Sequence, residues 1–128
     1  MAIAAVLAPG STLLGFDVEN NVDTVIDAAG KYVIPGGIDA HTHMEMPFGG
    51  TQASDTFETG TRAAAWGGTT TIVDFVVQTF GQQVQDSLAA WHEKAGGNCA
   101  VDYGFHQIIG GVDEQSLKAM ETLGDEGI

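Results

Sequence analysis

The chain has 128 residues, and its 17 acidic and 4 basic side chains give a formal net charge of −13. A surface this acidic repels the phosphates of nucleic acids and of anionic membranes, so we exclude both as partners. The length suits one domain that buries about two thirds of its unfolded surface. The single cysteine, Cys99, excludes an internal disulfide, and we expect it to be a small apolar residue at a strand start.

The N-terminal stretch MAIAAVLAPG does not have the pattern of a targeting signal. No Lys or Arg precedes Lys31, so the charged region of a signal peptide is missing, and the apolar run is too short to span a bilayer. We therefore expect a cytoplasmic location. Short apolar runs predict three strands before the main pattern begins, at residues 3–7, 24–28 and 31–34.

From residue 37 onward, strand patterns alternate with helix patterns. We predict strands at residues 37–43, 69–75 and 100–109, with the start of a fourth at 127–128, and helices at 56–66, 83–95 and 113–123. The strands begin 28 to 32 residues apart, which is the length of a βα unit. Such units build either an open doubly wound sheet or a (β/α)8 barrel. No Gly-x-Gly-x-x-Gly follows a strand, which favours the barrel.

Local signals within the helices predict their ends and their inner faces. Asp55 and Glu58 have the spacing of a capping box, and two glycines follow the first helix. Apolar periodicity predicts that two helices each turn three side chains inward: Val84, Leu88 and Trp91 in the second, and Leu117, Met120 and Leu123 in the third. A barrel needs about twice this length, so the 128 residues are expected to be part of a longer enzyme.

The strand at 37–43 ends in His41-Thr42-His43, after a Pro-Gly-Gly turn. Because side chains alternate along a strand, both imidazoles lie on one face, where they can converge on one metal ion. A His-x-His pair alone is a weak signal, but functional residues at the carboxyl end of a strand are typical of barrel enzymes. Asp39 shares this face, and it either serves the site, as a further ligand or by holding an imidazole, or caps a turn.

The sequence PGGIDAHTHMEMPFGGT resembles the dihydropyrimidinase/hydantoinase branch of the metal-dependent amidohydrolases. The resemblance continues through DTFETGTRAAAWGGTTTIVDF, WHEKA and VDYGFH, so it covers most of the chain from residue 25 onward. It implies a TIM-barrel hydrolase whose mouth holds two divalent metals, usually zinc, bridged by a carboxylated lysine. Only His41 and His43 match that ligand set here, because the lysine segment should begin just beyond Ile128.

The resemblance also implies roles for the loop that follows the histidines. Met46 and Phe48 match hydrophobic contacts to the substituent of the substrate ring, although ordinary packing would explain each of them equally well. Glu45 stands where dihydroorotase-like relatives place an arginine, which favours a neutral cyclic ureide or imide as substrate. The non-catalytic relatives lose the second histidine, so His43 favours an enzyme lineage.

Other polar residues have structural explanations. We expect His92 to lie on a solvated helix face and His106 to be a hydrogen-bonded core histidine. Asp74 ends the predicted strand at 69–75, where it either supports the site from behind or caps the strand. Lys31, Lys94 and Lys118 lie outside the expected lysine segment and receive no metal role, while Arg62 is expected to form a structural ion pair.

Together these observations predict two domains: residues 1–35 as a partial β-sandwich and 36–128 as the N-terminal portion of a (β/α)8 barrel. The predicted function is that of an N-terminal fragment of a dihydropyrimidinase or hydantoinase, which opens cyclic amides to N-carbamoyl amino acids and is inactive as the isolated chain. The expected partners are a small cyclic ureide or imide and either further copies of the chain or the remainder of the same enzyme. The alternatives are a non-catalytic interaction or assembly module and another cyclic amidohydrolase such as an allantoinase.

Overall fold

The computed structural model describes residues 29–128, so the strands predicted at 3–7 and 24–28 lie outside the described residues. The strand predicted at residues 31–34 is wrong, because residues 31–36 have no regular structure. Tyr32 and Ile34 are 71% and 61% exposed, so this stretch finds little apolar surface to pack on among the described residues. From Gly37 to Ile128 the chain belongs to one compact unit.

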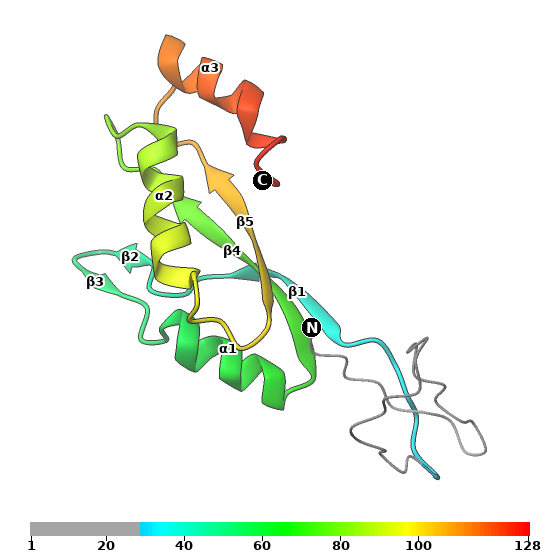
Figure 1. The fold of residues 1–128 in the computed structure, drawn as a ribbon. Helices are drawn as coiled ribbons and strands as arrows, with labels where there is room; N and C mark the ends of the chain where they lie inside the picture. Colours follow the sequence, from blue (N-terminus) through cyan, green and yellow to red (C-terminus); the bar gives the residue numbers. More distant parts are fainter. Residues whose placement is uncertain (1–28) are drawn as a thin grey trace. The chain divides into compact units, whose positions relative to one another are not determined.

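A three-stranded parallel sheet in the order β1-β4-β5 organises this unit (Figure 1). Its strands are β1 (Gly37–Thr42), β4 (Thr69–Val77) and β5 (Asp102–Ile108). The alternation of strands with helices and the parallel pairing confirm the predicted α/β class. A short antiparallel hairpin, β2 (Pro47–Phe48) with β3 (Thr51–Gln52), lies in the segment between β1 and the first helix.

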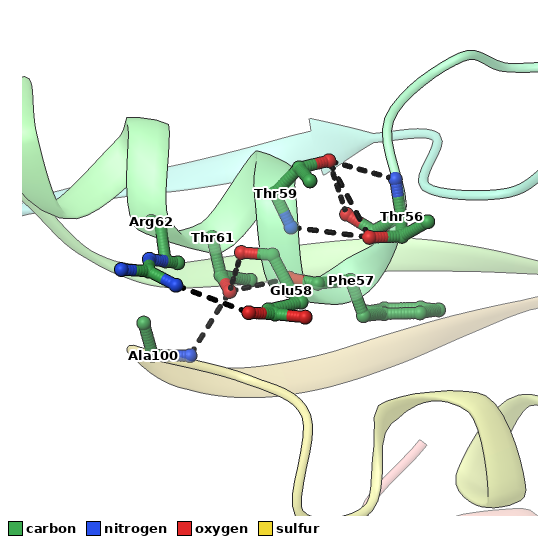
Figure 2. A network of polar contacts seen from close by, with 7 residues as sticks. All are labelled: Thr56, Phe57, Glu58, Thr59, Thr61, Arg62 and Ala100. Atoms are coloured by element: carbon green, nitrogen blue, oxygen red, sulfur yellow. Dashed lines mark hydrogen bonds and ion pairs between the residues drawn. The ribbon is translucent and has the colours of Figure 1, made fainter.

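Helix α1 (Phe57–Trp66) begins at a capping box that the sequence predicted one residue too early. The cap is Thr56, whose hydroxyl accepts a hydrogen bond from the backbone N–H of Thr59, while the Thr59 hydroxyl accepts from the backbone N–H of Thr56 (Figure 2). Glu58 instead forms an exposed ion pair with Arg62 at 3.0 Å, which confirms the ion pair predicted for that arginine. Such a surface pair contributes little to stability.

The inner face of α1 is tied to the segment before β5 by one buried hydroxyl. Thr61 is fully buried, and its side chain donates to the carbonyl of Phe57 and accepts from the backbone N–H of Ala100 at 2.9 Å (Figure 2). This second bond spans 39 residues of sequence. Because the Thr61 side chain is buried on the inner face of the helix, its bond to the Ala100 N–H fixes where the chain enters β5.

Helix α2 (Val84–Ala95) completes a hydrophobic core on one side of the sheet, with the predicted inner residues Val84, Leu88 and Trp91 all buried. Along β4, buried Ile72, Asp74 and Val76 alternate with half-buried neighbours, as expected for one face packed under helices. The core cluster joins this strand face to both helices and to β5. Its largest members are Phe57, Ile72, Val76, Val84, Leu88, Trp91, Phe105 and Leu123.

Helix α3 (Glu114–Leu123) corrects one predicted helix face. Leu123 is buried as expected, but Leu117 and Met120 are 54% and 46% exposed, and Ser116 is buried instead. This helix packs on α2 and not on the sheet, so the described residues cover only part of its apolar face. The strand predicted to start at 127–128 is also wrong, because the Ile128 N–H donates to the Leu123 carbonyl in a turn that follows the helix.

None of the helices in residues 29–128 is long and apolar enough to cross a membrane.

Candidate metal centre

The two imidazoles predicted to share a face do converge. The Nε2 atoms of His41 and His43 lie 3.1 Å apart, and the rings meet edge to face with centroids 4.9 Å apart. Strand β1 ends at Thr42, one residue earlier than predicted, so His43 is the first residue after the strand. Both histidines are exposed, at the carboxyl end of β1.

The ring of Phe75 supports both imidazoles from the neighbouring strand β4. Its centroid lies 4.4 Å from that of His41 and 5.3 Å from that of His43. His106 on β5 contacts the same ring at 5.0 Å, and its exposure shows that it is not the core histidine predicted. Alternation could have indicated this grouping, because Phe75 lies one residue from Asp74 on β4 and so faces the opposite side of the sheet.

The histidine pair has the geometry of two ligands for one metal ion. With zinc–nitrogen bonds of about 2.0 to 2.1 Å and tetrahedral angles, two nitrogen ligands lie about 3.3 Å apart, close to the 3.1 Å between these Nε2 atoms. Within the described part of the chain, no cluster of three or more His, Cys, Asp or Glu side chains could hold a metal. The pair therefore fits as part of a ligand set, not as a whole one.

The carboxylate of Asp39 accepts a hydrogen bond from the backbone N–H of His41 at 3.2 Å, and not from an imidazole. This contact is local, and it holds a backbone amide where the pairing of β1 with β4 is irregular, between residues 39 and 42. Of the two predicted explanations, the observed bond corresponds to the backbone cap.

Asp74 is fully buried and lies inside β4, which continues to Val77, so it does not end the strand as predicted. Its Oδ2 accepts from the hydroxyl of Thr42 at 2.9 Å and from the backbone N–H of Met44 at 2.7 Å. Its Oδ1 accepts from the indole N–H of Trp91 at 3.1 Å. The carboxylate thus connects the residues on both sides of His43 to helix α2.

Met44, the residue after the histidine pair, packs against helix α1. A Cβ added at Gly60 would lie 2.3 Å from the Met44 sulfur, so this side chain occupies the space that a larger residue at position 60 would need. Glu45 follows with φ of 51°, and its carboxylate accepts from the backbone N–H of Phe57 at the start of α1. Its carbonyl accepts from Lys94 at 3.3 Å. The Met44–Gly60 and Glu45–Phe57 contacts were not predicted, because they depend on how the loop returns to the helix.

Met46 and Phe48, the predicted substrate contacts, lie at the hairpin that follows. Phe48 belongs to β2 and is 76% exposed, while Met46 is half-buried and its carbonyl accepts from the backbone N–H of Ala53. Among the described residues, neither side chain makes a ring or polar contact with the histidine pair. His92, as expected, is an exposed residue of α2, although its ring meets Phe105 edge-on at 5.0 Å.

Cys99 is half-buried beside the core, ahead of β5, where a structural role was expected. Burial, together with the negative charge of Asp74, raises the pKa of the thiol from 9.0 to about 11. The thiolate is the nucleophilic form, so the folded chain holds this cysteine in its unreactive state at neutral pH.

Alkylation of Cys99 by iodoacetamide is expected to be at least tenfold slower in the folded chain than in urea at pH 8. The rate in the folded chain should rise with a midpoint near pH 11, against about 9 in urea. Because the folded-state pKa is the higher one, its contribution to stability is complete below pH 9 and is lost as the pH rises toward 11. Mass spectrometry follows the reaction at this single thiol, and equal rates in both states would contradict the assignment.

The parallel sheet, its one-sided helical cover and the histidine pair at a strand end define an α/β protein in which two imidazoles converge at the carboxyl end of β1. The chain belongs to the amidohydrolase family, whose pattern it matches over residues 32–126. Among its relatives, the D-hydantoinase of Streptomyces coelicolor is 61% identical over 127 residues, which cover 98% of this chain and 26% of that protein.

A second relative, the dihydropyrimidinase of Rattus norvegicus, is 39% identical over 95% of this chain and 22% of its own length. The crystal structure of dihydropyrimidinase from Brevibacillus agri matches with a TM-score of 0.80 and 50% identity, over 88% of this chain and 24% of that one. The chain therefore spans about a quarter of the length of these relatives.

Proposed function

We propose that this chain contributes the His-x-His portion of the active site of a cyclic amidohydrolase, which opens hydantoin or dihydropyrimidine rings to N-carbamoyl amino acids. The observation that carries the proposal is the convergence of the His41 and His43 Nε2 atoms to 3.1 Å. This convergence occurs at the end of a parallel strand, in a chain that is 61% identical to a D-hydantoinase.

In this proposal His41 and His43 hold a divalent metal, for which we propose zinc. When bound, the metal supplies an activated water and polarises the carbonyl that is attacked. The chain's own part is to keep two imidazoles converging, with Phe75 packed against both rings. Catalytic zinc commonly has three protein ligands, so the other ligands, a bridging lysine among them, come from elsewhere in the complete enzyme.

The substrate of this proposal is a neutral cyclic ureide or imide. Glu45 supports this choice, because a carboxylate near the site disfavours an anionic substrate. That carboxylate caps α1 through the Phe57 N–H, so its position is fixed. Met46 and Phe48 are proposed to contact the substituent of the ring, and the high exposure of Phe48 leaves it free to do so.

We further propose that the three βα units are the first three of a (β/α)8 barrel, with residues 36–128 in the barrel and 1–35 in a β-sandwich. Support for the barrel comes from the parallel order β1-β4-β5 (Figure 1). It also comes from the helices, which pack on one face of the sheet, while the histidines contact Phe75 on the other. In a barrel the second face is the interior.

The test is a ring-opening assay on the product of the complete gene that encodes this chain. Dihydrouracil, hydantoin and allantoin are supplied in turn, and the carbamoyl product is measured. We expect activity on one of the first two, loss of that activity with a chelator and with His41→Ala, and little change with His92→Ala, the matched control on the exposed face of α2.

The isolated 128-residue chain is expected to open none of these rings, because it offers too few metal ligands. Measurable ring opening by the pure chain would contradict the proposal that it carries only part of the site. A complete product that opens no ring in the presence of added zinc would favour a non-catalytic module, and activity on allantoin alone would favour an allantoinase.

A further inference from the structure

The buried carboxylate of Asp74 accepts hydrogen bonds from both neighbours of His43 and from helix α2. A buried carboxylate is costly unless its oxygens are satisfied, and here three donors satisfy them. Two of these donors, the Thr42 hydroxyl and the Met44 N–H, belong to the residues immediately before and after His43. Both bonds end on the same oxygen, Oδ2.

The sheet supports the backbone of the histidine pair only as far as Thr42, which is paired with Asp74 on β4. Pairing of β1 with β4 is irregular between Asp39 and Thr42, and the strand ends before His43. The N–H of His41 donates to the Asp39 side chain at 3.2 Å. The side chain of Asp74 thus adds two hydrogen bonds at the point where the β1–β4 ladder ends, and one of them reaches Met44, beyond the strand.

The third donor fixes the carboxylate itself. Trp91 is 5% exposed, and its indole N–H holds Oδ1 from helix α2. The ammonium group of Lys94 lies 4.3 Å from the centroid of the same indole and also donates to the carbonyl of Glu45. Helix α2 thus supports both the carboxylate and the loop that follows the histidine pair.

We propose that Asp74 is a positioning residue, whose carboxylate fixes the chain on both sides of His43 so that the two imidazoles converge. The inference rests on the proposed function in one respect: it takes the converged pair to be a metal ligand pair. Asp74 itself does not contact the metal or the substrate, because its oxygens are turned to Thr42, Met44 and Trp91 on the helix-covered side of the sheet.

The chemistry of the three donors allows a matched pair of variants. An asparagine at position 74 can accept the bonds from the Thr42 hydroxyl and the Met44 N–H with its single oxygen. Its NH₂ group would then oppose the indole N–H of Trp91. Trp91→Phe removes that N–H. The double variant Asp74→Asn/Trp91→Phe therefore keeps the bonds to Thr42 and Met44. The variant Asp74→Ala/Trp91→Phe loses both of these bonds in the same Trp91→Phe background.

Two measurements on the 128-residue chain test the proposal. The first is the affinity for Co²⁺ and Zn²⁺, by the visible spectrum and by calorimetry. The second is the nuclear Overhauser contact between the ring protons of His41 and His43, recorded without metal. We expect Asp74→Ala/Trp91→Phe to bind at least tenfold more weakly and to lose the contact, while Asp74→Asn/Trp91→Phe and Trp91→Phe keep both.

Thr42→Val is a milder test that is not expected to prevent folding, since it removes one hydroxyl from a half-buried residue. It should weaken metal binding severalfold. If the asparagine and alanine variants give the same affinity and the same ring contact, Asp74 has no positioning role. If the product of the complete gene neither binds zinc nor opens a ring, but the ring contact in the 128-residue chain follows the expected order, the positioning role stands and the proposed function fails.

Discussion

Replacing Phe57 with alanine is expected to lower the free energy of unfolding by about 3 to 5 kcal/mol. The side chain is fully buried and meets Phe105 edge-on, with ring centroids 6.3 Å apart. It occupies the first position of α1, so the cavity would open where the helix, the sheet and the loop after the histidines meet. Because small domains are stable by only about 5 to 15 kcal/mol, this loss is a large share of the total.

Urea denaturation, followed by circular dichroism, measures the effect of Phe57→Ala. Phe80→Ala is the matched control, because it removes the same ring from a residue that is 87% exposed. Substitutions at such surface positions usually change stability by less than about 0.5 kcal/mol. Comparable losses for the two variants would mean that the packing around Phe57 is not a main support of this fold.

Alanine at Gly110 is expected to cost about 2 to 3 kcal/mol, although the change adds one methyl group. A Cβ there would lie 2.3 Å from the backbone carbonyl oxygen of Gln78, which cannot move without shifting the end of β4. Gln78 is 5% exposed, and its side-chain oxygen accepts from the N–H groups of Gly110 and Gly111. Moving Gly110 would therefore also disturb the contacts that join the loops after β4 and β5.

Gly124→Ala provides the comparison for this prediction. Gly124 caps α3 with helical dihedral angles, φ −62° and ψ −36°, and a Cβ there would meet no atom within 4 Å. The change should be neutral or stabilise the chain by up to about 1 kcal/mol, because alanine has less backbone freedom to lose on folding. The result contradicts the structure if Gly110→Ala is as well tolerated as Gly124→Ala in thermal unfolding.

Periodicity in the sequence was enough to predict every strand and helix longer than two residues between 37 and 123. Helix ends were harder, because two overlapping patterns compete at the start of α1. Asp55 and Glu58 have the capping-box spacing, and so do Thr56 and Thr59, which form the observed cap. The choice depends on where the preceding loop brings the chain, which local sequence does not determine.

The histidine pair was predictable because strand alternation is a local rule, whereas the role of Asp74 was not. Its partners lie 17 to 32 residues away and meet it only after β1, β4 and α2 have packed in register. One signal was available: Asp74 shares a strand face with Ile72 and Val76, and a charged residue on a buried face needs hydrogen-bond partners. The exposure of Leu117 and Met120 could not be predicted either. Helical spacing shows that the two side chains share a face but not whether a neighbouring element covers it.

The packing of Met44 against Gly60 couples two positions that have different roles. One follows a candidate ligand, and the other is a residue in the middle of a helix, where glycine costs roughly 0.5 to 1 kcal/mol relative to alanine. A helix former at position 60 would recover that energy only after the flexible end of the Met44 side chain had moved aside or a shorter residue had replaced it. A substitution in the histidine loop is therefore expected to change which residues helix α1 accepts at position 60.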